Sequence, residues 1–281
     1  MQDHKLTSEQ VTGFIHSLKE NERVSGTLEK YQRDVSRFAQ WMDGRSVTKE
    51  LTAEWKEHLR EAGYQSATIN SMLAVINSFL RFVGWEECRV KYLRIQRRIF
   101  REEAKELNRN EYDRLIDTAR SLGRDRLALL IETIGSTGIR VSEVRYITVE
   151  AAKRGRTEIA LKGKIRTILL STKLCRKLLK YAGKNKIASG EVFLTRSGKS
   201  LSRRQIWSEM KRLCKHAGVE PSKVFPHNLR HFFATAFYRA YKDIVRLADV
   251  LGHSSIETTR IYLKTAGEEH ARQLDGLKLV V

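Results

Sequence analysis

The chain has 281 residues, enough for about two domains, and its 41% hydrophobic and 31% charged residues are typical of a globular protein. Self-repulsion at a formal net charge of +20 disfavours a compact state unless a polyanion shares the charge, so nucleic acid is the leading partner. No stretch approaches the roughly 18 apolar residues of a membrane span, and the polar start MQDHKLTSEQ lacks the apolar core of a signal peptide. We therefore expect a cytoplasmic, nucleoid-associated protein without membrane contact.

The first 88 residues are predicted to form an all-helical domain of four short helices. Thr7 and Gln10 can form a capping box ahead of the first apolar stripe. Three further stripes lie within residues 28–42, 52–62 and 69–83, and the last is the strongest.

A basic segment follows, RVKYLRIQRRIFR at residues 89–101, with alternating basic and apolar residues and no helical stripe. Residues 89–103 are either a solvated linker between two domains or a strap that follows DNA. In the second case Arg94, Arg97 and Arg98 would contact phosphates.

The remaining residues, 104–281, are predicted to form a second, mixed domain that begins near the helix start at Asn108 and Glu111. Strands are expected at 157–161 and 166–170 around the tight turn Lys162-Gly163-Lys164, and another at 192–195. Most of the rest has helical patterns, including residues 111–122, 126–134 and 172–182. The predicted fold is thus mainly α with a small β-sheet, an α+β arrangement.

The cysteines and acidic residues argue against a metal centre. Cys88, Cys175 and Cys214 are far apart, with no CxxC pair and no Cys/His ligand spacing, so a zinc site is not expected. We also find no acidic cluster and no HExxH motif. The sequence therefore predicts neither a metal nor a cofactor.

Three segments concentrate polar residues in patterns that packing does not require: STGIRVSEV, PHNLRHFFAT and LGHSSIETTRIYLK. Taken singly, their arginines and histidines read as exposed or paired surface residues, and Tyr262 as a packed aromatic. Taken together, two arginines and two histidines can converge on a phosphodiester, because guanidinium groups donate paired hydrogen bonds and stay charged. Such a site would need no metal.

Tyr262 is the candidate nucleophile of this site. A tyrosine hydroxyl is weak at neutral pH and needs cationic neighbours, and its attack would store the energy of the broken bond in a covalent phosphotyrosine. The leaving oxygen needs a proton, which Lys162 or Lys164 at the turn around Gly163 can supply. A Lys-Gly-Lys turn is more often only a solvated turn.

In this order the motifs resemble those of the tyrosine recombinase, or phage integrase, family. The matching residues are Thr137-Gly138-Ile139-Arg140-Val141-Ser142-Glu143, His227-Asn228-Leu229-Arg230-His231, Leu251-Gly252-His253, and Tyr262 nine residues later. The resemblance implies that Arg140 and Arg230 clamp the scissile phosphate, that His227 and His253 assist by hydrogen bonding and proton transfer, and that Tyr262 attacks. Glu143 would support the site from behind Arg140.

The hairpin departs from the family's pattern, because its turn is one residue shorter than G-K-G-x-K-x-R. Lys162 is favoured as the general acid, since it alone directly precedes the turn glycine. Lys164 and Arg166 are then expected to contact DNA.

The resemblance also implies a compact two-domain recombinase: a SAM-like core-binding domain at 1–88, a linker, and a catalytic domain at 104–281, without an arm-binding domain. Such a protein would clamp double-stranded DNA at short inverted core sites and exchange strands through a 3′-phosphotyrosyl intermediate and a Holliday junction, without ATP. A homotetramer would be linked by exchange of the C-terminal tail, whose apolar end is LKLVV, residues 277–281, and an accessory DNA-bending or directionality protein is possible.

Two alternatives stay open at this point. The chain could be a catalytically silent DNA-binding protein of the same fold, or a type IB topoisomerase-like enzyme that relaxes DNA without exchanging strands. The sequence does not distinguish integration, excision, inversion and dimer resolution, and it does not record the DNA target.

Overall fold

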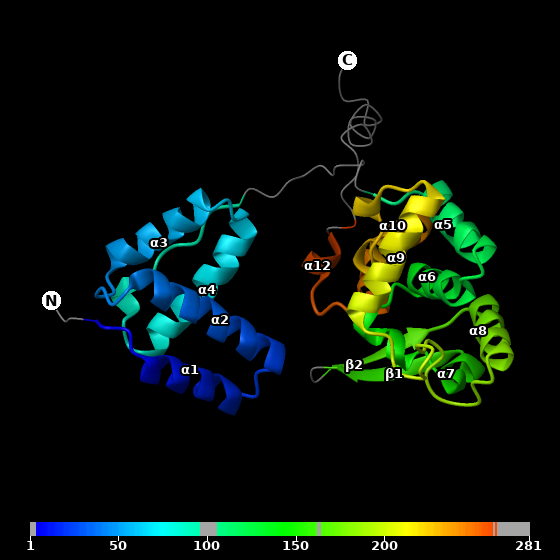
Figure 1. Cartoon of the computed structure of the whole chain (residues 1–281), viewed down its shortest axis with the longest axis horizontal. Helices are drawn as coiled ribbons and strands as arrows, with labels where there is room; N and C mark the ends of the chain where they lie inside the picture. The colour runs from blue at the N-terminus through cyan, green and yellow to red at the C-terminus, as the bar shows by residue number, and fades with distance from the viewer. Residues whose placement is uncertain (1–3, 96–105, 162–163, 261, 263–281) are drawn as a thin grey trace, which may run out of the picture. The chain divides into compact units, whose positions relative to one another are not determined.

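The computed structural model describes residues 4–95, 106–161, 164–260 and 262, and the chain divides into two compact units, residues 1–97 and 98–281 (Figure 1). Each unit buries its own apolar core. Within the described ranges, no helix combines the length and the apolar character that crossing a membrane requires.

The first unit is a helical bundle, as predicted. Its elements are α1 (Ser8–Glu20), α2 (Ser25–Met42), α3 (Lys49–Glu61), α4 (Ser66–Phe82) and the short 3-10 helix η1 (Glu86–Cys88). Thr7 forms the predicted capping box with Gln10 at the start of α1. The bundle closes around aromatic side chains that the helical stripes place inside, among them Phe14, Phe38, Trp55 and Phe79.

Two asparagines of α4 hold the chain that leaves this unit. Asn77 is buried, and its side chain donates to the carbonyl of Val90 at 2.9 Å and accepts from the N–H of Val90 at 3.1 Å. Asn70, two turns earlier on α4, makes the same pair of bonds with Leu93 at 2.9 and 2.8 Å. Residues 90–93, the start of the predicted basic linker, therefore lie against the first unit.

The second unit is mainly helical and contains one small sheet. Its elements are α5 (Arg109–Ser121), α6 (Asp125–Thr137), η3 (Val141–Tyr146), α7 (Val149–Arg154), β1 (Arg156–Leu161), β2 (Lys164–Leu169), α8 (Thr172–Lys184), α9 (Arg203–Ala217), η4 (Pro221–Lys223), α10 (Pro226–Tyr241), α11 (Ile244–Leu251) and α12 (Ile256–Arg260). The predicted α+β class, mainly helical with a small sheet, is confirmed.

The sheet is an antiparallel hairpin in which Leu161 pairs with Lys164. Its alternation places Ile159 of β1 and Ile168 of β2 in the core, whereas Ile165 is 80% exposed. Arg166 shares the buried face with Ile168, because side chains two apart on a strand point to the same side. This arrangement decides where Arg166 lies.

The strand predicted at residues 192–195 is wrong. The chain makes only isolated bridges there, Thr148 with Glu191 and Leu194 with Ser200. Val192 and Phe193 are 0% and 1% exposed, so the apolar run reflects burial of an irregular segment in the core.

We predict that replacing Asn77 destabilises the first unit much more than replacing Asn70. Asn77→Ala leaves the N–H and carbonyl of Val90 buried without partners, which should lower the free energy of unfolding by about 2–4 kcal/mol. Asn70→Ala, at a half-buried position, should cost about 1 kcal/mol. Urea denaturation of the full chain followed by tryptophan fluorescence measures both changes. Equal decreases in the free energy of unfolding in the two variants would contradict this account of how the asparagines hold residues 90–93.

Candidate active site

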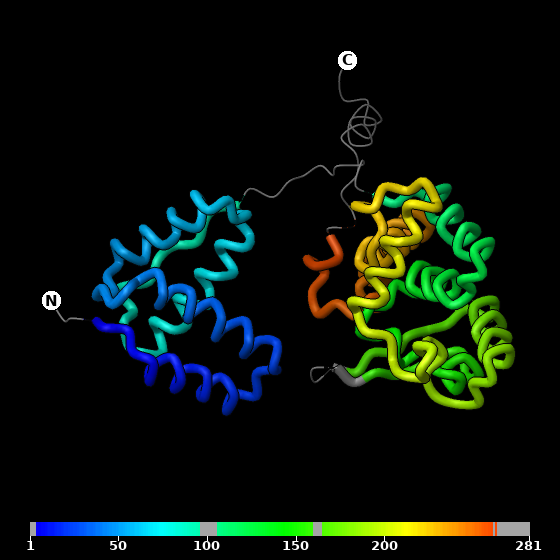
Figure 2. The backbone as a smooth tube through the Cα atoms, viewed as in Figure 1, coloured from blue at the N-terminus to red at the C-terminus, as the bar shows by residue number. Residues whose placement is uncertain are grey.

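The three polar segments singled out in the sequence come together in the second unit. Arg140 caps η3, His227 and Arg230 lie on α10, and His253 follows α11. Helix α11 packs against both α10 and α12, and α12 is the orange-red segment of the backbone trace (Figure 2). The residues are therefore gathered from parts of the chain more than a hundred positions apart.

Gly138 makes this convergence possible. It ends α6 with φ +64°, a left-handed conformation that favours glycine. A Cβ at this position would lie 2.4 Å from Phe233 and 2.9 Å from Leu251, so a side chain would push α10 and α11 away. Its carbonyl also accepts a hydrogen bond from Arg230 Nη1 at 2.5 Å. The glycine of the TGIR motif is thus a packing requirement.

Glu143 joins two arginines beneath the site. It is 1% exposed and accepts from Arg140 Nη1 at 2.8 Å and from Arg166 Nη1 at 2.7 Å. Its carboxylate also accepts from the backbone N–H of Arg140 at 2.8 Å. Arg140 itself is 40% exposed, so its guanidinium is held from behind and open in front, and the second nitrogen, Nη2, lies 3.3 Å from the carbonyl of Gly252.

Arg230 lies deeper, at 3% exposure. Its Nη2 donates to the carbonyl of Leu251 and to Nε2 of His253, both at 2.8 Å. Burial and the charge of Arg140 lower the pKa of Arg230 to about 10, an effect that Tyr262 partly offsets by hydrogen bonding. The group remains a cation at neutral pH.

His253 is fixed as a neutral ring. A guanidinium can only donate, so Nε2 must accept from Arg230, and the ring proton then sits on Nδ1 and is donated to Thr259 Oγ1 at 2.9 Å. Burial and the surrounding arginines lower the pKa of His253 to about 4. At neutral pH it therefore acts as a hydrogen-bond acceptor that orients Arg230.

Tyr262 lies beside these groups and is only 3% exposed. It packs in a small apolar cluster with Ala234, Leu247 and Leu251. Its ring meets that of His231 edge-on at 4.6 Å and stacks on that of His253 at 6.1 Å. Tyr262 is therefore a packed aromatic residue, and it also lies next to Arg230, His231 and His253.

His227 is the exposed histidine of the group. It sits in the first turn of α10, directly after Pro226, whose missing N–H costs nothing at a helix start. Its charge contributes to the lowered pKa of His253, so the two rings are electrostatic neighbours.

Arg166, which we predicted to contact DNA, lies under the site and not on the surface. It is 9% exposed, and its two terminal nitrogens donate to Glu143 and to the carbonyl of Val250, each at 2.7 Å. Gly252, with φ +62°, passes so close that a Cβ would lie 2.3 Å from Arg166 Cδ. This geometry favours a positioning role over a DNA contact.

The other predicted residues are mostly not described in the structure. Lys162, Arg97 and Arg98 lie outside the described residues, as does the predicted exchange tail, 263–281. Lys164 begins β2 opposite Leu161. Arg94 is exposed in the first unit.

A cavity of about 450 Å³ opens over the cluster and holds residues that the sequence analysis missed. Arg203, the first residue of α9, lines it together with Arg140, Ser254 and Thr258. Only the helix-start signal of Ser202 precedes Arg203 in the sequence, so no motif marks it. Thr259, fully buried, was also missed as the partner of His253.

The comparisons with known proteins agree with these motifs. The tyrosine recombinase XerC of Roseiflexus castenholzii is 29% identical over 279 residues, covering 91% of this chain and 88% of that protein. The tyrosine recombinase XerA of Thermococcus kodakarensis is 29% identical over 264 residues, covering 90% of each. Among solved structures, a similar fold is found in the XerH site-specific recombinase bound to a palindromic difH substrate, in a post-cleavage complex. The TM-score is 0.71 at 19% identity, and the match covers 88% of this chain and 79% of that one.

Family models cover most of both units. Residues 11–87 match the phage integrase N-terminal SAM-like domain, and residues 105–269 match the phage integrase family. The match to 105–269 spans more than half of the chain and contains every one of the motifs from Thr137 to Tyr262. The resemblance inferred from those motifs is confirmed, and the chain belongs to the phage integrase family.

Proposed function

We propose that this protein is a tyrosine site-specific recombinase, which cleaves and rejoins DNA strands through a 3′-phosphotyrosyl intermediate. One observation carries the proposal. Arg140, held by the buried carboxylate of Glu143, and His253 line one cavity, while Arg230 bonds His253, on which the ring of Tyr262 stacks. The relatives named as tyrosine recombinases support the same reaction over nearly the whole chain.

The arginines provide the phosphate site. Arg140 presents an open guanidinium face, and Arg230 is held by hydrogen bonds to the carbonyls of Gly138 and Leu251, to His253 and to Tyr262. Donors fixed in this way stabilise the charge that builds on the non-bridging oxygens, and losing one typically costs about 100- to 1000-fold in rate. Because the arginines supply this charge stabilisation, the proposed step requires no metal.

Tyr262 supplies the nucleophile. Its hydroxyl gives up its proton, for which His227 is the candidate acceptor, and its oxygen forms a bond to phosphorus while the bond from phosphorus to the 5′ oxygen breaks. That leaving oxygen takes a proton from the hairpin lysine, for which Lys162 is our candidate. The reverse attack by a 5′ hydroxyl of another strand regenerates Tyr262, so no ATP is consumed. Since Tyr262 is 3% exposed, binding of DNA must open its packing before the attack.

His227, exposed at the start of α10, is the better placed of the two histidines for proton exchange with solvent or phosphate. His253 already accepts a hydrogen bond from Arg230, and its role is to orient that guanidinium group. Arg203 extends the basic lining of the cavity and is proposed to bind a flanking phosphate.

The partner is DNA, and its finer description is part of the proposal. The net charge of +20 suits a polyanion, and the structurally similar XerH protein is bound to a palindromic substrate. We propose short inverted core sites, a homotetramer joined by the C-terminal tail, strand exchange through a Holliday junction, and work on the nucleoid in the cytoplasm. An accessory DNA-bending or directionality protein would decide the outcome at each site.

We predict that Tyr262→Phe abolishes covalent DNA adducts and leaves DNA affinity within about twofold, because only the hydroxyl is lost. The test uses DNA with a nick near the cleavage point, which traps the intermediate, and detects SDS-resistant adducts. Tyr238→Phe, on the same apolar cluster, is the matched control and should form adducts normally. Adducts that persist in Tyr262→Phe would move the nucleophile elsewhere and overturn the proposal.

We predict that Arg166→Lys slows cleavage at least about tenfold with little change in DNA affinity. A lysine carries one nitrogen and cannot bond Glu143 and the Val250 carbonyl together, so Arg140 and the loop of His253 lose their common anchor. Arg156→Lys, at an exposed position on the same hairpin, is the control. Single-turnover cleavage and binding isotherms separate the two effects. A loss confined to DNA affinity would restore the DNA contact predicted from the sequence.

We predict that His253 stays neutral until the pH falls to about 4, whereas its reference pKa is 6.5. The folded protein then binds fewer protons than the unfolded chain, so the stability it contributes is complete above about pH 6.5 and is lost as the pH falls towards 4. Histidine ring NMR signals, assigned with His253→Gln, give the midpoint directly. A midpoint at or above 6.5 would contradict the tautomer assigned here.

A further inference from the structure

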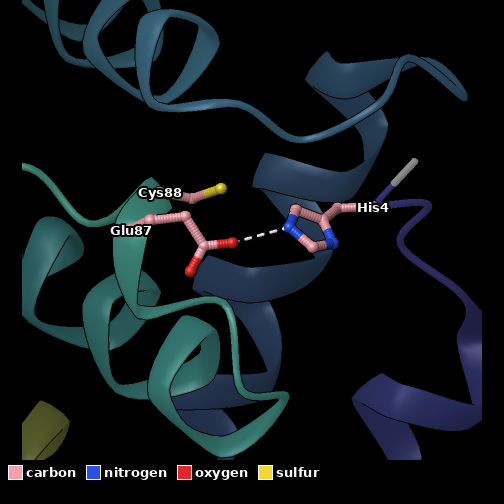
Figure 3. A group of neighbouring side chains, drawn as sticks. All are labelled: His4, Glu87 and Cys88. Carbon is pink, nitrogen blue, oxygen red and sulfur yellow. Dashed lines mark hydrogen bonds and ion pairs between the residues drawn. The ribbon is translucent and has the colours of Figure 1, made fainter. Parts of the chain in front are cut away.

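A second group of reactive side chains lies in the first unit, outside the recombinase site. His4, Glu87 and Cys88 reach toward one another from the N-terminal segment and from η1 (Figure 3). Their ligand atoms all lie within 4.8 Å of one another, and His4 Nε2 is 2.6 Å from Glu87 Oε1. Among the residues that the structure describes, this is the one place where three such side chains meet.

The fold holds these groups in place. The carbonyl of His4 accepts from the N–H of Val47 at 2.8 Å, and the His4 ring stacks on Trp85 at 4.8 Å. Cys88 is 2% exposed, and its sulfur lies 3.5 Å from the carbonyl of Val47. The backbone of His4 and the thiol of Cys88 thus both contact Val47, although they are far apart in the sequence.

The three donors suit zinc in type and spacing. Zinc binds thiolate, imidazole and carboxylate ligands at about 2.0–2.3 Å, which places tetrahedral ligands about 3.3–3.8 Å apart. Side-chain movements of about 1 Å would bring the group to that spacing. Glu50, at the start of α3, adds a second carboxylate charge near Cys88, so the surroundings favour a cation.

We propose that His4, Glu87 and Cys88 bind one zinc ion, with water as the fourth ligand. The ion replaces the hydrogen bond between His4 and Glu87, and the thiol proton of Cys88 is released to water as the metal–sulfur bond forms. The bound ion clasps the segment before α1 onto η1 and so closes the first unit. The sequence did not suggest this site, since 83 residues separate its two halves.

The test is a cobalt titration of the full chain after treatment with a chelator. Co²⁺ coordinated by a thiolate gives a sulfur-to-metal charge-transfer band, which should saturate at one ion per chain and disappear when Zn²⁺ is added. Cys88→Ser should lose the band. Cys175→Ser and Cys214→Ser replace the other two buried cysteines and should keep it.

Cys88 is buried, so its replacement can perturb folding. Variants of the other two ligands, which are less buried, test the site independently. His4→Asn and Glu87→Gln should weaken Zn²⁺ binding by at least about tenfold, because even an outer partner of a metal ligand is worth about 10- to 100-fold. Their circular dichroism without metal should match that of the wild type. Zn²⁺ should raise the Tm of the wild type and not that of His4→Asn.

Two results would overturn the proposal. The first is a wild-type chain that gives no thiolate band at millimolar Co²⁺, which would leave an ordinary ion pair between His4 and Glu87. The second is a band that survives in His4→Asn with unchanged affinity, which would assign the metal to other ligands.

Discussion

The carboxylate of Glu143 is buried between two guanidinium groups, and the arrangement of the active site depends on it. It fixes the backbone and side chain of Arg140 at the start of η3, and it holds Arg166 of β2. A carboxylate at 1% exposure is stable only when its oxygens are paired, and here both oxygens accept hydrogen bonds. Removing the carboxylate would leave two neighbouring cations with no counter-charge.

The same pairing leaves the site short of negative charge. Arg140, Arg166 and Arg230 carry three positive charges, and Glu143 supplies one negative charge among them. Burial is the main cause of the low pKa of His253 and of the lowered pKa of Arg230, and this excess of positive charge lowers both further. A phosphate diester entering the cavity would reduce this repulsion. The arginines that pair with Glu143 in the folded protein are thus also the charges that a bound phosphate would neutralise.

Much of the site could be predicted because its motifs are local and ordered. TGIR, HNLRH and LGH each combine a helix end with a polar residue, and such patterns are visible in a single sequence. The burial of Arg166, which the predicted DNA contact did not anticipate, follows from its register in the strand. Ile168 and Leu170 are buried at positions two and four residues later, and that alternation already places Arg166 on the inner face.

Other features had no signal in the sequence. Residues 192–195 resemble a strand because a buried irregular segment has the same apolar composition. The contact of Arg203 with the cavity and the meeting of His4 with Cys88 arise only when distant segments pack together. Composition and periodicity describe one segment at a time, so a site built from several segments can be found only when each carries its own motif.

Arg166 links the two parts of the site that the motifs describe separately. It bonds Glu143 behind Arg140, and it bonds the carbonyl of Val250 just before the loop of His253. It also lies on the strand that follows the hairpin turn, four residues after the candidate general acid Lys162. The bonds of Arg166 therefore fix β2 relative to Arg140 and to the loop of His253, and a shift of this strand would move both parts of the site.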